Sequence, residues 1–107
     1  MYCATSIFAK RQLDDKFHRL DAAIAQAAKS IPSYLGDEAW ENTDTGLVSN
    51  VYDWESLTAL QELMQHPTHR EAKATQSNWL DSYQVVISQV LRTYGEGKVA
   101  DHALSQR

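Results

Sequence analysis

Residues 46–54 combine polar and aromatic side chains with apolar ones. If this stretch is a strand, its two-residue period places four side chains on one face, Val48, Asn50, Tyr52 and Trp54. The Asn50 amide and the Trp54 indole N–H can both donate to an oxygen that gains negative charge, while the aromatic rings can stack on a flat substrate. Trp54 also fits as a core residue and Asn50 as a water-bonded surface residue, so both interpretations stay open.

The histidine and cysteine residues provide fewer candidates for catalysis or metal binding. His66 and His69 lie on either side of Pro67, where they orient a helix junction more simply than they bind metal, so no metal site is predicted. His69 is also a candidate proton acceptor at the mouth of a pocket, because the ordinary pKa of histidine suits that task. Cys3 is the only cysteine, which excludes an intrachain disulfide and a cysteine-based zinc site. We interpret it as a small apolar residue on a strand.

These candidates must be positioned by strands and helices that the sequence also indicates. Alternating patterns predict strands over residues 2–9, 47–54 and 83–94, and an aromatic-rich stretch with a distorted start predicts another over 33–42. Apolar residues at spacings of three and four predict helices over 12–31 and 57–64. Pro67 ends the second helix and suits the first position of a third, over 68–80.

The predicted order of elements is strand, helix, strand, strand, helices, strand. This order is that of the ferredoxin-like βαββαβ fold, an α+β fold with an antiparallel sheet and helices on one face. The first and fourth strands carry apolar residues on both faces, which indicates that a second copy covers the face without helices. We therefore expect a homodimer of single domains spanning residues 1–95, with a tail over 96–107 that is mobile or packed on the partner.

Composition excludes several classes of function. The chain has 107 residues and a formal net charge of −4, and its basic residues are scattered, so nucleic acid is not an expected partner. No apolar run approaches the roughly 20 residues that span a bilayer, and the first residues do not form a signal peptide. We expect a cytoplasmic protein that does not bind membranes.

At this point the sequence resembles a known family. The run VYDWESLTAL at 51–60, then HPTHREA at 66–72, Trp79 and YQV at 83–85, is similar to the antibiotic biosynthesis monooxygenase domain. The likeness extends over residues 8–94. It implies a ferredoxin-like protomer that dimerises through its sheet into a dimeric α+β barrel, with a pocket in each subunit that takes a small aromatic or apolar ligand.

Within that family, cofactor-independent monooxygenases that oxidise quinol- or anthrone-like phenols with O2 carry an asparagine four residues before a tryptophan. The resemblance implies that Asn50 and Trp54 are catalytic, that Val48, Tyr52 and His69 bind substrate, and that no cofactor is needed. Such enzymes of the actinorhodin type also have a tyrosine soon after the tryptophan, which this chain lacks. A non-enzymatic ligand-binding or stress-response dimer is therefore the alternative, and an isomerase or lactone-processing enzyme stays open.

The haem-degrading branch of the same family is disfavoured. Its members have an asparagine on the first strand, a tryptophan on the second helix and a histidine about ten residues later. The corresponding positions of this chain fall within residues 3–6, at Leu63 and at Lys73.

Overall fold

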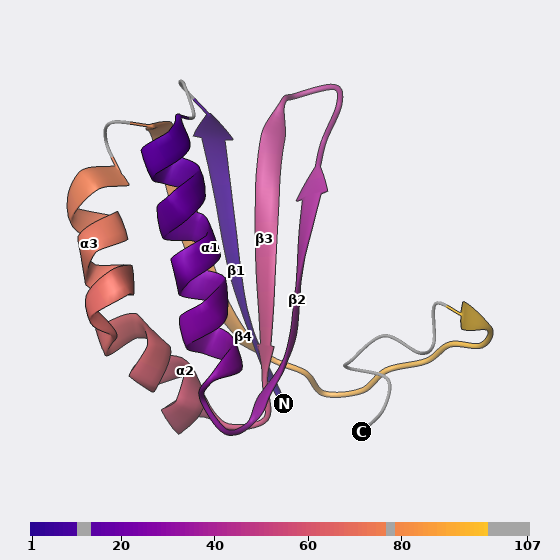
Figure 1. Cartoon of the computed structure of the whole chain (residues 1–107). Helices are drawn as coiled ribbons and strands as arrows, with labels where there is room; N and C mark the ends of the chain where they lie inside the picture. The colour runs from indigo at the N-terminus through magenta and orange to yellow at the C-terminus, as the bar shows by residue number, and fades with distance from the viewer. Residues whose placement is uncertain (11–13, 77–78, 99–107) are drawn as a thin grey trace.

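The computed structural model describes residues 1–10, 14–76 and 79–98 (Figure 1). Within them the elements are β1 (Tyr2–Lys10), α1 (Asp15–Lys29), β2 (Tyr34–Glu41), β3 (Leu47–Trp54), α2 (Leu57–Gln65), α3 (Pro67–Thr75) and β4 (Leu80–Gln89). The strands form one antiparallel sheet in the order β2-β3-β1-β4. The predicted ferredoxin-like α+β fold is confirmed. No helix among the described residues is long and apolar enough to cross a membrane.

Local sequence signals explain where each helix begins. The Asp14 carboxylate accepts a hydrogen bond from a first-turn amide of α1 at 2.9 Å, and the Ser56 hydroxyl caps α2 in the same way at 3.2 Å. Pro67 occupies the first turn of α3, where its missing N–H costs nothing, and the His66 imidazole caps that helix. The predicted role of His66 at the helix junction therefore has a direct structural counterpart.

The predicted boundaries around the last strand were wrong. The third helix ends at Thr75 and does not reach Leu80, where β4 already begins, three residues before the predicted start of that strand at Tyr83. The last strand was predicted over 83–94 but ends at Gln89, because that residue lies opposite Tyr2 at the start of β1 and no strand remains for it to pair with. The Val90 N–H still donates to the Met1 carbonyl at 2.9 Å, residues 91–98 then run away from the sheet (Figure 1), and residues 99–107 of the predicted tail lie outside the described residues.

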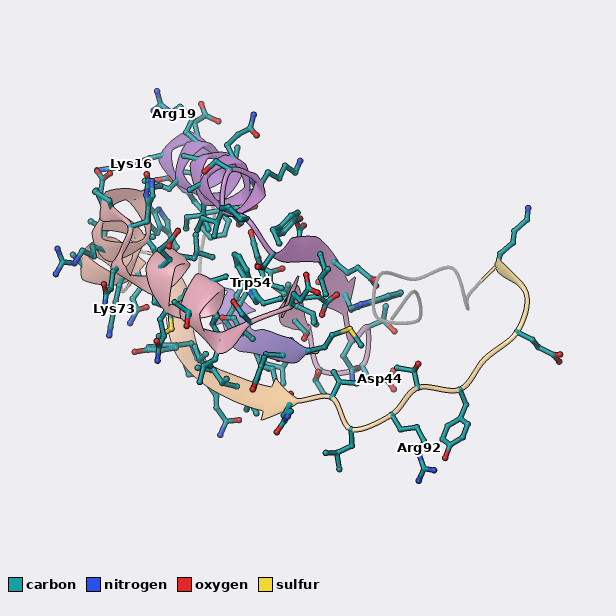
Figure 2. All side chains as sticks on the ribbon, turned by 90° about the horizontal axis from the view of Figure 1, so that it is seen from below. Lys16, Arg19, Asp44, Trp54, Lys73 and Arg92 are labelled. Carbon is teal, nitrogen blue, oxygen red and sulfur yellow. The ribbon has the colours of Figure 1, made fainter. Side chains whose placement is uncertain are left out.

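The helices cover one face of the sheet only. Viewed almost along the strands, Figure 2 shows the helix layer on one side of the sheet and the segment after β4, which carries Arg92, extending on the other side. The opposite, outer face exposes apolar side chains, among them Trp40, which is 64% exposed, Leu47 and Val86. The prediction that a single helix layer leaves one sheet face uncovered is confirmed for the chain as described.

The hydrophobic core lies at the end of β3. Trp54 is 0% exposed there and packs with Ala27, Ala28, Ile31, Ala59, Leu60 and Leu63. The Tyr34 ring meets the Trp54 ring edge to face at 5.6 Å. Since these residues come from both α1 and α2, this cluster fixes the two helices to the end of β3.

Candidate functional site

A cavity of about 390 Å³ lies between the helix layer and the sheet. Its floor is built by β1, β3 and β4, and its roof by all three helices. The lining is mostly apolar and aromatic, with a few polar side chains: Ser6, Asp21, Asn50, Tyr52, His69, Lys73, Gln76 and Tyr83. A cavity of this size and character is typical of sites for small organic molecules.

The strand register arranges the floor in rows. Asn50 of β3, Ser6 of β1 and Val85 of β4 lie side by side in the middle row. The row on one side of this middle row contains Phe8 and Tyr83. The row on its other side contains Ala4, Tyr52 and Ile87, and the residues of both rows line the cavity. The amide of Asn50 and the hydroxyl of Ser6 therefore form the polar centre of a largely apolar floor.

Phenol and carboxyl groups gather on the side of the cavity nearest β2. Tyr52 lines the cavity, and burial, followed by the charges of Asp37 and Asp21, raises its pKa. Tyr34 donates a hydrogen bond to Asp37. Burial also raises the pKa of Asp21, with a further contribution from Asp37 that His18 opposes. The Tyr52 hydroxyl is thus kept protonated and can donate to a ligand.

His69 lines the cavity, as the sequence predicts. Burial lowers the pKa of its imidazole, the Lys73 charge adds to this, and the Met64 carbonyl opposes it by accepting a hydrogen bond. The Nδ1 atom is buried and has no hydrogen-bond partner among the described residues. His69 is therefore neutral near pH 7, and its Nδ1 atom is shielded from solvent.

Trp54 and Val48 lie on the predicted face of β3 but do not line the cavity. The Trp54 indole is enclosed by the core, and its Nε1–H is buried without a hydrogen-bond partner in the described part of the chain. Figure 2 shows the side chain between the sheet and the helices. Sequence periodicity predicts which face of a strand a residue lies on. Whether that residue is buried in the core or lines the cavity depends on which helix residues pack over it. The catalytic role of Trp54 stays a prediction.

No group of three or more His, Cys, Asp or Glu residues that could hold a metal ion occurs in the ranges the structure describes. Cys3 lies on the outer sheet face, where its thiol donates to Asp53 at 3.3 Å. Burial first, and then Asp53, raise the pKa of Cys3 to about 11. A thiol held in this protonated form is a poor nucleophile, in agreement with the interpretation of Cys3 as a small structural residue.

Sequence reasoning did not include five polar residues of the cavity among the candidate site residues: Ser6, Asp21, Lys73, Gln76 and Tyr83. Ser6 lies within the strand predicted over residues 2–9, and its period places it on one face with Ala4 and Phe8. Asp21 lies on α1 one turn from Phe17 and from Ile24, which line the same cavity. The pairing register of β1 with β3 was the missing information, because it alone sets Ser6 beside Asn50.

The fold and its cavity can now be compared with known proteins. No protein-family model matches the sequence, and no curated protein matches it. Solved structures do match, and many of them are antibiotic biosynthesis monooxygenase-type proteins. The chain has the ferredoxin-like α+β fold of that class.

Three of the similar structures illustrate the match. Rv0793 from Mycobacterium tuberculosis is 17% identical with a TM-score of 0.73, and the match covers 88% of this chain and 98% of that one. SnoaB, a cofactor-independent oxygenase from Streptomyces nogalater, is 12% identical with a TM-score of 0.72, with coverages of 89% and 97%. A candidate antibiotic biosynthesis monooxygenase from Deinococcus radiodurans is 14% identical with a TM-score of 0.71, with coverages of 91% and 99%. At these identities the likeness establishes the fold alone.

Proposed function

We propose that this chain is a cofactor-independent monooxygenase that oxidises a quinol- or anthrone-like aromatic with O2. The observation that carries the proposal is the position of Asn50, a polar side chain without a side-chain hydrogen bond among the described residues, at the centre of an apolar cavity floor. The similarity of the fold to SnoaB supports the same reaction class.

The chemistry requires little from the protein beyond positioning. An anthrone loses a proton to give an electron-rich phenolate, which reduces O2 directly. One oxygen atom becomes the new carbonyl of the product and the other leaves as water, so the substrate supplies all the electrons. The Asn50 amide would donate to the phenolate oxygen, and the protonated Tyr52 hydroxyl could hold a second oxygen of the substrate.

His69 can take part only after a local rearrangement. Its neutral imidazole has the right protonation state for a base, but the free Nδ1 atom is buried. Rotation of the ring would break the contact with the Met64 carbonyl and turn a nitrogen toward the ligand. We therefore place His69 among the residues that bind substrate, with a role in proton transfer that depends on this movement.

We also propose that the protein works as a homodimer built sheet to sheet. The exposed Trp40, Leu47 and Val86 lie on the outer sheet face, opposite the cavity, and a patch of this kind is unfavourable in water. Sedimentation or light scattering at micromolar concentration should show a dimer, and Trp40→Glu should give a folded monomer. A monomeric parent protein would contradict the proposed interface.

The oxygenase proposal is tested by O2 uptake with an anthrone such as dithranol, in the presence of a chelator and with protein free of flavin absorbance. Asn50→Ala should lower kcat by about a hundredfold, a typical cost of removing one oxyanion donor. Ser49→Ala is the matched control, because Ser49 precedes Asn50 on β3 but faces away from the cavity. If Asn50→Ala turns over the anthrone as fast as Ser49→Ala does, Asn50 does not have this role.

A specific observation favours the alternative of a non-enzymatic ligand-binding dimer. The Trp54 indole N–H, which the family resemblance makes the second donor, is enclosed by the core rather than directed at the cavity. Under this alternative, the same cavity holds a small apolar molecule without reaction. This alternative would be supported if no quinol or anthrone of a panel caused O2 uptake while one of them raised the melting temperature of the protein.

A further inference from the structure

We infer that Ser6 is the second hydrogen-bond donor to the ligand oxygen that Asn50 binds. The proposed function above gives Ser6 no role. The inference rests on the proposed function, because it uses the same cavity and the same ligand oxygen. It goes further by naming a residue of β1 that shares the binding of the phenolate oxygen with Asn50.

The strand register brings the two side chains together. Ser6 and Asn50 are directly paired on neighbouring antiparallel strands, and both line the cavity. Side chains at paired positions have Cβ atoms about 5 Å apart, so a hydroxyl and an amide there can reach one oxygen atom between them. Serine supplies one rotatable O–H donor and asparagine an NH2 group with two.

Both side chains are also available. Both residues are half-buried, and neither has a side-chain hydrogen bond to another described residue. A half-buried polar group that the protein leaves without a partner is satisfied by water or by a ligand. The apolar surroundings favour a charged acceptor between the two donors, since hydrogen bonds are stronger in a medium of low polarity.

The arrangement also explains how the cavity could work although the Trp54 indole is enclosed. A phenolate oxygen placed over the middle of the floor would lie against Ser6 and Asn50, and the ring would lie against Phe8, Val85 or Ile87. The register puts Trp54 two rows away from Asn50, beside Tyr2 and beyond Tyr52. Ser6 is therefore the nearest side-chain donor to Asn50 on the floor.

The test measures the ionisation of a bound phenol and does not depend on turnover. The probe is 4-nitrophenol, which is not oxidised in this reaction and whose phenolate absorbs visible light. Other titratable groups of the cavity wall, Asp21, Tyr52, His69, Lys73 and Tyr83, are the same in all variants, so their effects cancel in the comparison. The parent protein should bind the phenolate better than the phenol and lower the pKa of the bound probe.

Ser6→Ala should raise the pKa of the bound probe by about one unit, which means roughly tenfold weaker binding of the phenolate and little change for the neutral phenol. Ser6→Thr, which keeps the hydroxyl, should retain the parent behaviour, and Ser49→Ala on the opposite face is the matched control. Circular dichroism verifies that each variant is folded.

Each outcome of this experiment supports or overturns the role of Ser6. Equal pKa values in the parent and Ser6→Ala, equal loss in Ser6→Ala and Ser6→Thr, or no binding of the probe by the parent would overturn the inference. If the shift appears but no anthrone is oxidised, the donor pair stands and the oxygenase proposal fails. If anthrone is oxidised and Ser6→Ala leaves the probe unchanged, the oxygenase proposal stands and Ser6 is not a donor.

Discussion

The substitution Trp54→Phe separates a packing role of the indole from a chemical one. Trp54 is fully enclosed by residues of α1 and α2, and its ring packs edge to face on Tyr34. Its Nε1–H is buried and has no partner in the described residues. Phenylalanine keeps an aromatic ring against Tyr34 but removes two ring carbons and this N–H group. Loss of packing and loss of an unfavourable polar group therefore act in opposite directions.

The magnitude follows from three contributions. Removing two buried carbons costs about 1.5 kcal/mol of transfer free energy. A residual cavity of roughly 40 Å³ adds about 1 kcal/mol. Removing a buried N–H that has no hydrogen-bond partner raises the free energy of unfolding by about 1–2 kcal/mol. We expect Trp54→Phe to lower the free energy of unfolding by about 1 kcal/mol, whereas Trp54→Ala should cost about 3–5 kcal/mol.

The assay is urea unfolding followed by circular dichroism, at one fixed protein concentration because the proposed dimerisation would contribute to stability. A cost of about 3 kcal/mol or more for Trp54→Phe, with an unchanged dependence on urea, would refute the reasoning, because it would mean that the indole N–H makes a hydrogen bond in the folded protein. A cost near 1 kcal/mol together with loss of anthrone oxidation would instead restore the catalytic role that the sequence predicts for Trp54.

Three other predictions concern single side chains. Ser56→Ala should lower the free energy of unfolding by about 1 kcal/mol in urea titrations, because the hydroxyl caps α2; no change would mean that water replaces the cap. Burial, then Lys73, lowers the pKa of His69, so the folded protein resists its protonation, and stability falls as pH drops below the ordinary value of 6.5. The urea midpoint should therefore fall less between about pH 8 and pH 5 in His69→Gln than in the parent, and equal falls would contradict this. Cys3, with its pKa raised by burial and Asp53, should react with iodoacetamide at neutral pH only after unfolding; rapid modification of the native protein would show that the thiol is accessible as thiolate.

Much of the fold could be read from local patterns. The strand over 47–54, the cap at Ser56, the start of the third helix at Pro67 and the distorted start of the second strand follow from side-chain period, turn chemistry and missing N–H groups, which act over a few residues. The end of β4 could not be read in this way. Alternation continues past Gln89, but a strand ends where its partner ends, and β1 begins at Tyr2.

The candidate site was likewise predictable from the sequence only in part. The sequence by itself determined that Asn50, Tyr52 and Trp54 share a face of one strand, because a strand has a fixed period of two residues. Only the tertiary structure decided that Asn50 and Tyr52 line a cavity while Trp54 is sealed in the core, and that Ser6 stands beside Asn50. The physical reason is that cover and register arise from contacts between residues far apart in the chain. A period along one strand carries no information about which helix lies over each row, or about which residue of another strand is its neighbour.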